Sequence, residues 1–253
     1  MKYKGEITNG KYSKGKEYDD DGRLKYEWEY LKGERINGKE YNYYGSLKFE
    51  GEYFKGERNG KGKEYEYSKL KFEGEYLKGE RIKGKEYYYD GKLRFEGDYL
   101  NNNKKKGKLY KYDILQFEGE FMNDKKWNGK GYDAKGNKTY ELKNGKGKIW
   151  EYYKNGNKEF EGDYLNGERN GKGKEYYENG KLKFEGKYSY GKRRTGKEYY
   201  ENGKLEFEGE YFHNERLRGK EYDLDGKIRE IKECSSCHGY YKKLQNSRSD
   251  EKK

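Results

Sequence analysis

Residues 173–186 read GKEYYENGKLKFEG, and the fold follows from this stretch. Aromatic or aliphatic residues alternate with charged ones, and a period of two indicates β-strands. The central Asn179-Gly180 pair predicts a tight type I′ turn between two strands. With this turn Tyr177 faces Leu182, lysines face glutamates, and glycine faces glycine. The stretch therefore predicts a β-hairpin in which opposite charges and apolar side chains meet across the strands.

The same pattern repeats along the chain. A Gly-Lys-Glu-Tyr element or a variant of it recurs from Gly15 to Gly219, in step with a second marker, Phe-Glu-Gly. The phenylalanines of this marker are Phe49, Phe72, Phe95, Phe117, Phe160, Phe184 and Phe207, and Tyr3, Tyr26 and Tyr140 stand in the remaining units. Ten units of about 23 residues predict an all-β fold, an elongated single-layer antiparallel meander of stacked β-hairpins with about twenty strands.

The composition requires this architecture to be thin. Charged residues make up 43% of the chain, hydrophobic residues only 29%, and the mean hydropathy is −1.69, values typical of disordered segments. The chain nevertheless contains 33 Tyr, 10 Phe and 3 Trp, so its apolar surface is concentrated in large rings. Rings without aliphatic filling cannot build a thick core, which favours a single layer over a globular domain.

The second connection in each unit is represented by residues 166–169, NGER. A two-residue loop and a four-residue loop both fit it, and the sequence does not decide between them. Either loop leaves Phe160, Gly162 and Tyr164 on the same face as Gly173. We therefore expect one face of rings alternating with glycines, where each glycine leaves a slot for a neighbouring ring, and a second face of mainly Lys and Glu.

The repeating unit resembles a known family. The unit reads Tyr/Phe-Glu-Gly-Glu-Tyr, then Asn-Gly-Glu-Arg-Asn-Gly-Lys-Gly, then Tyr-Tyr and Asn-Gly-Lys. This unit looks like the membrane occupation and recognition nexus (MORN) repeat in its Lys/Glu-rich variant form. The resemblance covers about residues 1–232. It implies a sheet of stacked hairpins that serves as a scaffold, a dimerisation module, a peptide-groove binder or a binder of anionic lipids. Some members carry an added enzyme domain, for which this chain has no room.

Two units depart from the pattern within the array. Trp28 stands where Phe-Glu-Gly has its glycine, opposite Gly15, so the first slot is predicted to be filled. Between Tyr140 and Gly147 the connection is about six residues short, which indicates a bare hairpin turn. We expect a bend or a change of twist near residues 133–158.

The last unit and the tail form a separate prediction. KIREIK, residues 227–232, places Glu230 and Lys232 where Phe and Gly are expected, and a charged edge strand is typical of a cap. Residues 1–232 are therefore expected to form the repeat array. Residues 233–253 lose the period and are expected to form a flexible polar tail.

The tail contains the motif CSSCH, with Cys234, Cys237 and His238. This is the haem c attachment pattern, but the rest of the chain shows neither a haem pocket nor an export signal. Half of an intermolecular zinc or redox site is a second interpretation, and a reduced tail without a metal is the third. We expect no cofactor and no metal, with these three residues as the weak candidates.

Other features bear on the class of function. The histidines His213 and His238 lie far apart and no nucleophile arrangement surrounds them, so we do not expect an enzyme or a small-molecule substrate. Nucleic-acid binding is not expected either, because the rings are predicted to stack on one another. No apolar stretch could span a membrane or form a signal-peptide core. We expect a cytoplasmic protein, peripheral at a membrane or at a cytoskeletal structure.

The net charge of +12 raises the question of an anionic partner. Local clusters lie at residues 104–106, 125–126 and 192–194. The connections add one arginine per unit at Arg35, Arg58, Arg81, Arg169 and Arg216. Spaced about 10 Å apart along one edge, these arginines could dock on anionic lipid headgroups or an acidic protein. Alternatively they are solvated loop residues, since a glutamate precedes each of them.

A line of apolar residues points to a protein partner. By strand parity it lies on the charged face near one edge, and it consists of Leu31, Phe54, Leu77, Leu100, Met122, Leu165 and Phe212. The connections add Ile36, Ile82 and Leu217. Loops could fold back over this line, or it could hold a helix or strand of a partner or a second copy of the chain. We favour a non-enzymatic scaffold that binds proteins or self-associates, with peripheral binding of anionic lipids as the alternative.

Overall fold

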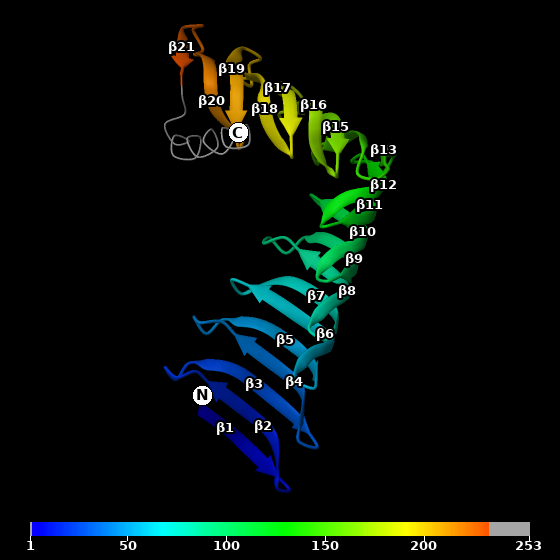
Figure 1. Cartoon of the computed structure of the whole chain (residues 1–253), viewed down its shortest axis with the longest axis vertical. Helices are drawn as coiled ribbons and strands as arrows, with labels where there is room; N and C mark the ends of the chain where they lie inside the picture. The colour runs from blue at the N-terminus through cyan, green and yellow to red at the C-terminus, as the bar shows by residue number, and fades with distance from the viewer. Residues whose placement is uncertain (1, 233–253) are drawn as a thin grey trace, which may run out of the picture. The chain divides into compact units, whose positions relative to one another are not determined.

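The structure, a computed structural model, describes residues 2–232. This part of the chain is all-β, with twenty-one strands and no helix. It folds as two compact units with their boundary between Asp124 and Lys125. The prediction of an antiparallel meander of successive hairpins is confirmed within each unit (Figure 1).

The first unit contains eleven strands in chain order, each paired antiparallel with the next. They are β1 (Lys2–Thr8), β2 (Lys11–Tyr18), β3 (Leu24–Leu31), β4 (Glu34–Tyr41), β5 (Leu47–Phe54), β6 (Glu57–Glu66), β7 (Lys69–Leu77), β8 (Glu80–Tyr87), β9 (Leu93–Leu100), β10 (Asn103–Lys111) and β11 (Ile114–Met122).

The second unit contains ten strands among its described residues. They are β12 (Lys125–Tyr132), β13 (Lys138–Leu142), β14 (Gly147–Tyr152), β15 (Lys158–Leu165), β16 (Glu168–Tyr176), β17 (Leu182–Ser189), β18 (Lys192–Tyr199), β19 (Leu205–Phe212), β20 (Glu215–Tyr222) and β21 (Ile228–Ile231). The strands β14 to β21 pair antiparallel in chain order, and β12 pairs with β13.

The core of each unit is a row of phenylalanine rings lying over pairs of glycines. Phe72 is fully buried, and a Cβ atom placed on Gly74 or Gly84 would come within 2.7 or 2.5 Å of its Cζ atom. The ring packs edge to face against Tyr76 and against Tyr99 of the next hairpin, with centroids 5.6 and 5.4 Å apart. Glycine is thus required at the paired positions because the ring occupies the space of a side chain.

The hairpin at Asn179-Gly180 does not have the predicted type I′ turn. The Gly180 amide donates to the Tyr177 carbonyl, the Tyr177 amide donates to the Lys181 carbonyl, and Gly180 alone has a positive φ, 82°. This is a three-residue loop, a type I turn closed by a left-handed glycine. Next to the turn it shifts the register by one residue, so that Tyr176, and not Tyr177, faces Leu182. A bulge then restores the predicted register, in which Lys174 faces Glu185 and Gly173 faces Gly186.

The second connection is a two-residue loop, the alternative that the sequence left open. Asn166 and Gly167 have φ angles of 54° and 75°, as a type I′ turn requires, and Leu165 faces Glu168. A β-bulge follows Arg169, because Tyr164 pairs with Arg169 whereas Gly162 pairs with Gly173. Similar bulges occur in the other repeats, and in each the arginine lies on the face that carries the rings.

Two of the expected irregularities within the array, the filled slot at Trp28 and the bare turn after Tyr140, are present, and the expected bend near residues 133–158 stays a prediction. Trp28 faces Gly15 on one side and Gly38 on the other, and its ring would lie 2.3 Å from a Cβ atom on Gly38. Between β13 and β14 a bare two-residue turn, Asn144-Gly145, connects the strands. The ladder there is reduced to one bridge, between Lys143 and Lys146.

The prediction for the last strand was wrong by one residue. Arg229 faces Glu221 and Ile231 faces Gly219, so these two residues, and not Glu230 and Lys232, hold the Phe and Gly positions. The reason is that β20 and β21 pair without the bulge that shifts the register in the other hairpins.

Candidate functional site

The arginines of the connections lie in a part-buried ladder of ion pairs. Arg58 binds both carboxylate oxygens of Glu40, with Nε and Nη2 at 2.7 and 2.8 Å, and its Nη1 lies 3.5 Å from Glu64. The guanidinium carbon lies 3.9 Å from the centroid of the Phe49 ring, a cation–π contact. Each arginine therefore joins one hairpin to its neighbour while covering the ring core.

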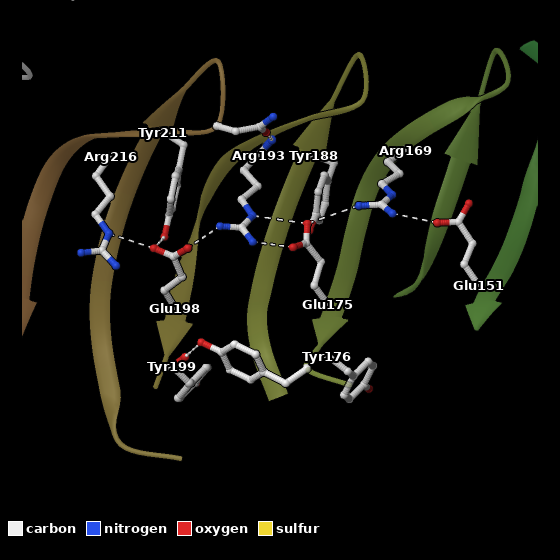
Figure 2. Close-up of polar contacts among 12 residues, drawn as sticks. Glu151, Arg169, Glu175, Tyr176, Tyr188, Arg193, Glu198, Tyr199, Tyr211 and Arg216 are labelled. Atoms are coloured by element: carbon white, nitrogen blue, oxygen red, sulfur yellow. Dashed lines mark hydrogen bonds and ion pairs between the residues drawn. The ribbon is translucent and has the colours of Figure 1, made fainter. Parts of the chain in front are cut away.

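The same ladder runs through the second unit (Figure 2), where carboxylates and guanidinium groups alternate. Its members in order are Glu151, Arg169, Glu175, Arg193, Glu198 and Arg216. Tyrosines complete it, because the Tyr188 hydroxyl donates to Glu175 at 2.7 Å and the Tyr211 hydroxyl to Glu198 at 3.4 Å. The alternation balances the charges, so the ladder presents no excess of positive charge.

Sequence reasoning missed part of the ladder. Lys104 lies 2.9 Å from Glu86 and Lys126 lies 3.2 Å from Glu151, in the place that arginine holds elsewhere. Arg193 also belongs to the ladder, although the sequence suggested a surface cluster. Their spacing could have identified them, because each of these cations stands nine residues after the phenylalanine of its unit.

Two carboxyl groups of the ladder, Glu151 and Glu175, are held in the ionised form. Burial by itself would raise the pKa of Glu151, but the positive charges of Lys126 and Arg169 outweigh it and lower this pKa to about 2. Burial also opposes the ionisation of Glu175, whose pKa is nevertheless lowered, mainly by its hydrogen bond from Arg193. The ion pairs of Glu151 and Glu175 are thus complete at neutral pH.

The arginines predicted along one edge are therefore neither a row of free cations nor fully solvated loop residues. The side chains of Arg35, Arg58, Arg81, Arg169 and Arg216 are between 14% and 36% exposed, and each pairs with a ladder glutamate. For Arg58 the partner is Glu40 of the preceding repeat and not the adjacent Glu57. Contact of these arginines with lipid headgroups stays a prediction, and it would compete with ion pairs already formed.

The line of apolar residues that strand parity predicted, called the apolar row below, remains accessible, since no loop of the described residues covers it. Its exposed members are Leu31, Phe54, Leu77, Leu100, Met122 and Leu165, at 43–59% exposure. Phe212 is half-buried and packs edge to face against His213 at 4.3 Å. Of the three residues added by the connections, Ile82 is exposed, Ile36 is half-buried and Leu217 is buried. The row therefore stays a candidate for partner binding.

A groove that sequence reasoning did not predict runs along the first unit. Three adjoining hollows of about 830, 520 and 470 Å³ share residues at their borders and extend from β1 to β11. Paired glycines such as Gly62 and Gly74 form the floor, because these positions carry no side chain on either face. The slot that accepts a ring on one face thus leaves a trough on the other.

The walls of the groove alternate in charge from strand to strand. Along one wall Lys61 faces Glu75 and Glu75 faces Lys83, and the opposite wall repeats the order with Lys63 and Glu73. In the first repeat the corresponding Lys16 lies 2.8 Å from Glu27. A ligand in the groove would therefore meet both signs of charge in alternation.

Neither a metal-binding cluster nor a membrane-spanning helix occurs in the part of the chain that the structure describes. Residues 2–232 contain no group of three or more His, Cys, Asp or Glu side chains placed to bind a metal ion. They also contain no helix with the length and apolarity that a membrane crossing requires. Cys234, Cys237 and His238 lie outside the described residues, so the metal hypothesis stays untested.

Comparisons with known proteins do not assign the chain to a family. No protein-family model matches the chain, and a search of curated proteins gives no match. The MORN resemblance thus rests on the repeating residues alone and stays a prediction.

Proposed function

We propose that the chain is a non-enzymatic repeat scaffold of the MORN type that binds another protein through the groove of the first unit. The observation that carries this proposal is the apolar row at the border of the groove. Leu77 and Leu100 each stand two residues after a groove-wall carboxylate, Glu75 or Asp98, and so lie on the same face of the sheet.

The apolar row supplies affinity for a partner. About half of each side chain is already covered, so burial of the remainder contributes about 1 kcal/mol for each leucine or phenylalanine. Successive members are two strands apart, about 10 Å, and a partner that follows the groove meets a new one in every repeat. Several weak contacts in line then give a specific complex with an extended segment.

The groove walls set the register in which a polypeptide segment binds along the groove. Alternating Lys and Glu favour a polypeptide segment whose charged residues also alternate, and a shift by one strand would set like charges against each other. The glycine floor allows the backbone of the segment to approach closely. The expected partner is thus a polypeptide of mixed charge with apolar residues on one side.

The alternative, peripheral binding of anionic lipids, depended mainly on the arginines of the connections, and these arginines are already paired with glutamates. A lipid phosphate would have to draw an arginine such as Arg58 away from Glu40, and separating a part-buried ion pair costs more than a surface contact returns. Lysines outside the ladder, such as Lys105 and Lys192, are exposed and could still attract lipid weakly.

The proposal is tested by affinity capture from the native cell with the intact chain and with a Leu77→Ser, Leu100→Ser double variant. We expect a partner that is retained in high salt by the intact chain and lost by the double variant. A Leu224→Ser variant is the matched control, because Leu224 is equally exposed but lies in a connection of the second unit. Its partner list should equal that of the intact chain.

A parallel measurement addresses lipid. Liposomes containing phosphatidylserine should retain little of the chain at physiological salt. Retention that disappears with Lys105→Gln and Lys192→Gln and ignores the leucine changes would favour the lipid alternative. Equal capture of every partner by the intact chain and the leucine variant would overturn the scaffold proposal for this surface.

A further inference from the structure

The strand β1 forms an edge of the sheet in the first unit (Figure 1). Among the described residues it pairs with β2 and with no other strand, so its second edge presents backbone N–H and C=O groups that the sheet does not use. β1 is seven residues long and contains no proline, whereas the edge strand β21 has only four residues. An edge of this length can accept a further strand.

The ring core is open at β1. Ile7 holds the position of Tyr53 and Tyr76 in later units, two residues after the glycine of the slot. Tyr76 is 2% exposed, because it packs edge to face on Phe49 of the preceding repeat with ring centroids 5.3 Å apart. Ile7 is 63% exposed, and Tyr3 is 36% exposed although Phe49 and the other phenylalanines at its position are fully buried. The core thus ends at β1 with apolar surface that a further strand would cover.

The charge of Lys4 is not balanced across β2. Lys4 faces Lys16, and Lys16 already pairs with Glu27 at 2.8 Å. Elsewhere in the first unit each groove-wall lysine faces a glutamate or an aspartate, as Lys63 faces Glu73. Charge alternation is therefore broken at the edge of the sheet, and a carboxylate on the free side of Lys4 would restore it.

β1 supplies this carboxylate itself when two copies of the chain pair antiparallel about Gly5. Gly5 then faces Gly5 of the second copy, and Lys4 of each copy faces Glu6 of the other. On the opposite face Tyr3 of each copy meets Ile7 of the other. This is the order of the inner pairings, in which glycine faces glycine with lysine opposite glutamate on both sides. We infer that the free edge of β1 pairs antiparallel with β1 of a second copy of the chain.

The order Lys-Gly-Glu selects this partner. The inner strands of the first unit carry one sign of charge around the same position, as in residues 73–75, EGE, and residues 83–85, KGK. Two copies of such a strand would repel each other in an antiparallel pair, whereas two copies of β1 attract. Parallel pairing of β1 in register would set Lys4 against Lys4 and Glu6 against Glu6. The contact is therefore twofold and closes on itself, because each copy uses the same edge.

A single strand pair is a modest interface. It is smaller than the contact of a permanent dimer, so the dimer should dissociate on dilution. Hydrogen bonds of the ladder and burial of Tyr3 and Ile7 supply the affinity, and the charges set the register. Since the edge does not include Leu77 or Leu100, the dimer is independent of the partner proposed for the groove.

The test is sedimentation equilibrium of the full chain over the micromolar range, where we expect a monomer–dimer equilibrium. Glu6→Lys should raise the dissociation constant at least about tenfold, because the new lysine faces Lys4 of the second copy. Lys4→Glu should weaken the dimer to a similar extent. This second change sets a carboxylate opposite Lys16, so it favours the pairing of β1 with β2 and separates loss of the dimer from loss of folding.

Two charge combinations should restore association. In an equimolar mixture of Lys4→Glu chains and Glu6→Lys chains, Glu-Gly-Glu meets Lys-Gly-Lys as in the inner hairpins. A heterodimer about as stable as the dimer of the intact chain should form, detected with one variant fluorescently labelled. The double variant Lys4→Glu, Glu6→Lys should again dimerise with itself, because the reversed order is also self-complementary.

Two controls address other surfaces. Glu230→Lys changes an exposed charge on the edge strand β21 and should leave the dimer unchanged. Leu77→Ser, Leu100→Ser should dimerise normally even where it loses the groove partner. A chain that is monomeric throughout the range, or a dimer that survives both single charge reversals, would overturn the inference. So would a mixture that fails to associate, or a dimer lost with either control.

Discussion

Arg58 binds both carboxylate oxygens of Glu40, 18 residues earlier in the chain, at 2.7 and 2.8 Å. The pair ties the hairpin of β5 and β6 to the strand before it and covers the ring of Phe49. Since every repeat is tied only to its neighbours in this way, stability is expected to be distributed along each unit.

Removal of one ladder cation should therefore destabilise the chain locally. Arg58→Ala leaves Glu40 part-buried without its partner, and we expect a loss of about 2–3 kcal/mol for the adjoining hairpins. Hydrogen exchange should rise in β4, β5 and β6 and remain unchanged in β19. Arg218→Ala, which removes a mostly exposed arginine, is the control and should have little effect. Uniform loss of protection in every strand would instead indicate one cooperative core.

A side chain at a paired glycine should also weaken one hairpin. A Cβ atom on Gly186 would lie 2.1 Å from the Thr195 carbonyl oxygen and 2.6 Å from the Phe184 ring, so Gly186→Val forces the ring out of its slot. We expect a cost of about 1–3 kcal/mol, measured by urea unfolding. Lys187→Val, at the exposed neighbouring position, should be neutral or slightly stabilising. Equal costs for both changes would contradict the slot.

The ion-pair ladder predicts loss of stability in acid. The pKa of Glu151 is about 2 in the folded chain, below the ordinary value of 4.5 that applies when the chain is unfolded. The unfolded chain therefore binds the proton first, and the stabilisation, about 3 kcal/mol, is present above pH 4.5 and is lost as the pH falls towards 2.

Thermal melts followed by circular dichroism at a series of pH values would check this prediction. Glu151→Gln should be less stable than the intact chain at pH 7, because Lys126 then loses its carboxylate. Its melting temperature should fall less steeply between pH 4.5 and 2. An intact chain whose melting temperature is constant over that range would contradict the assignment of the ladder.

Tyrosines on the groove face should resist alkaline titration. Burial, followed by a hydrogen bond to Glu27, raises the pKa of Tyr41 to about 12, and the same causes act on Tyr65 beside Glu50. The raised values mean that both hydroxyls keep their protons and their hydrogen bonds until about pH 12. Ultraviolet difference spectra during alkaline titration should show a late class of tyrosines, and Glu50→Gln should move one of them to lower pH. Titration of all tyrosines in a single early step would contradict these contacts.

The sequence by itself determined the repeat, the strand composition and the glycine slots. The register of Trp28 against Gly15, the bare turn at Asn144-Gly145 and the antiparallel meander all follow from alternation and spacing, which are local properties of the chain. The exposed apolar row was predicted for the same reason, since strand parity alone places Leu77 opposite to the face of Tyr76.

The tertiary structure decided what the loops do. A three-residue loop at Asn179-Gly180 and a bulge after Arg81 each displace side chains by one position, and a one-residue shift exchanges the two faces of a strand. For this reason the arginines, which the sequence suggested as an exposed series along one edge, pair with glutamates on the ring face. The groove likewise appears only when many strands lie side by side, because its floor is made of glycines distant in sequence and its walls of charges that alternate between strands.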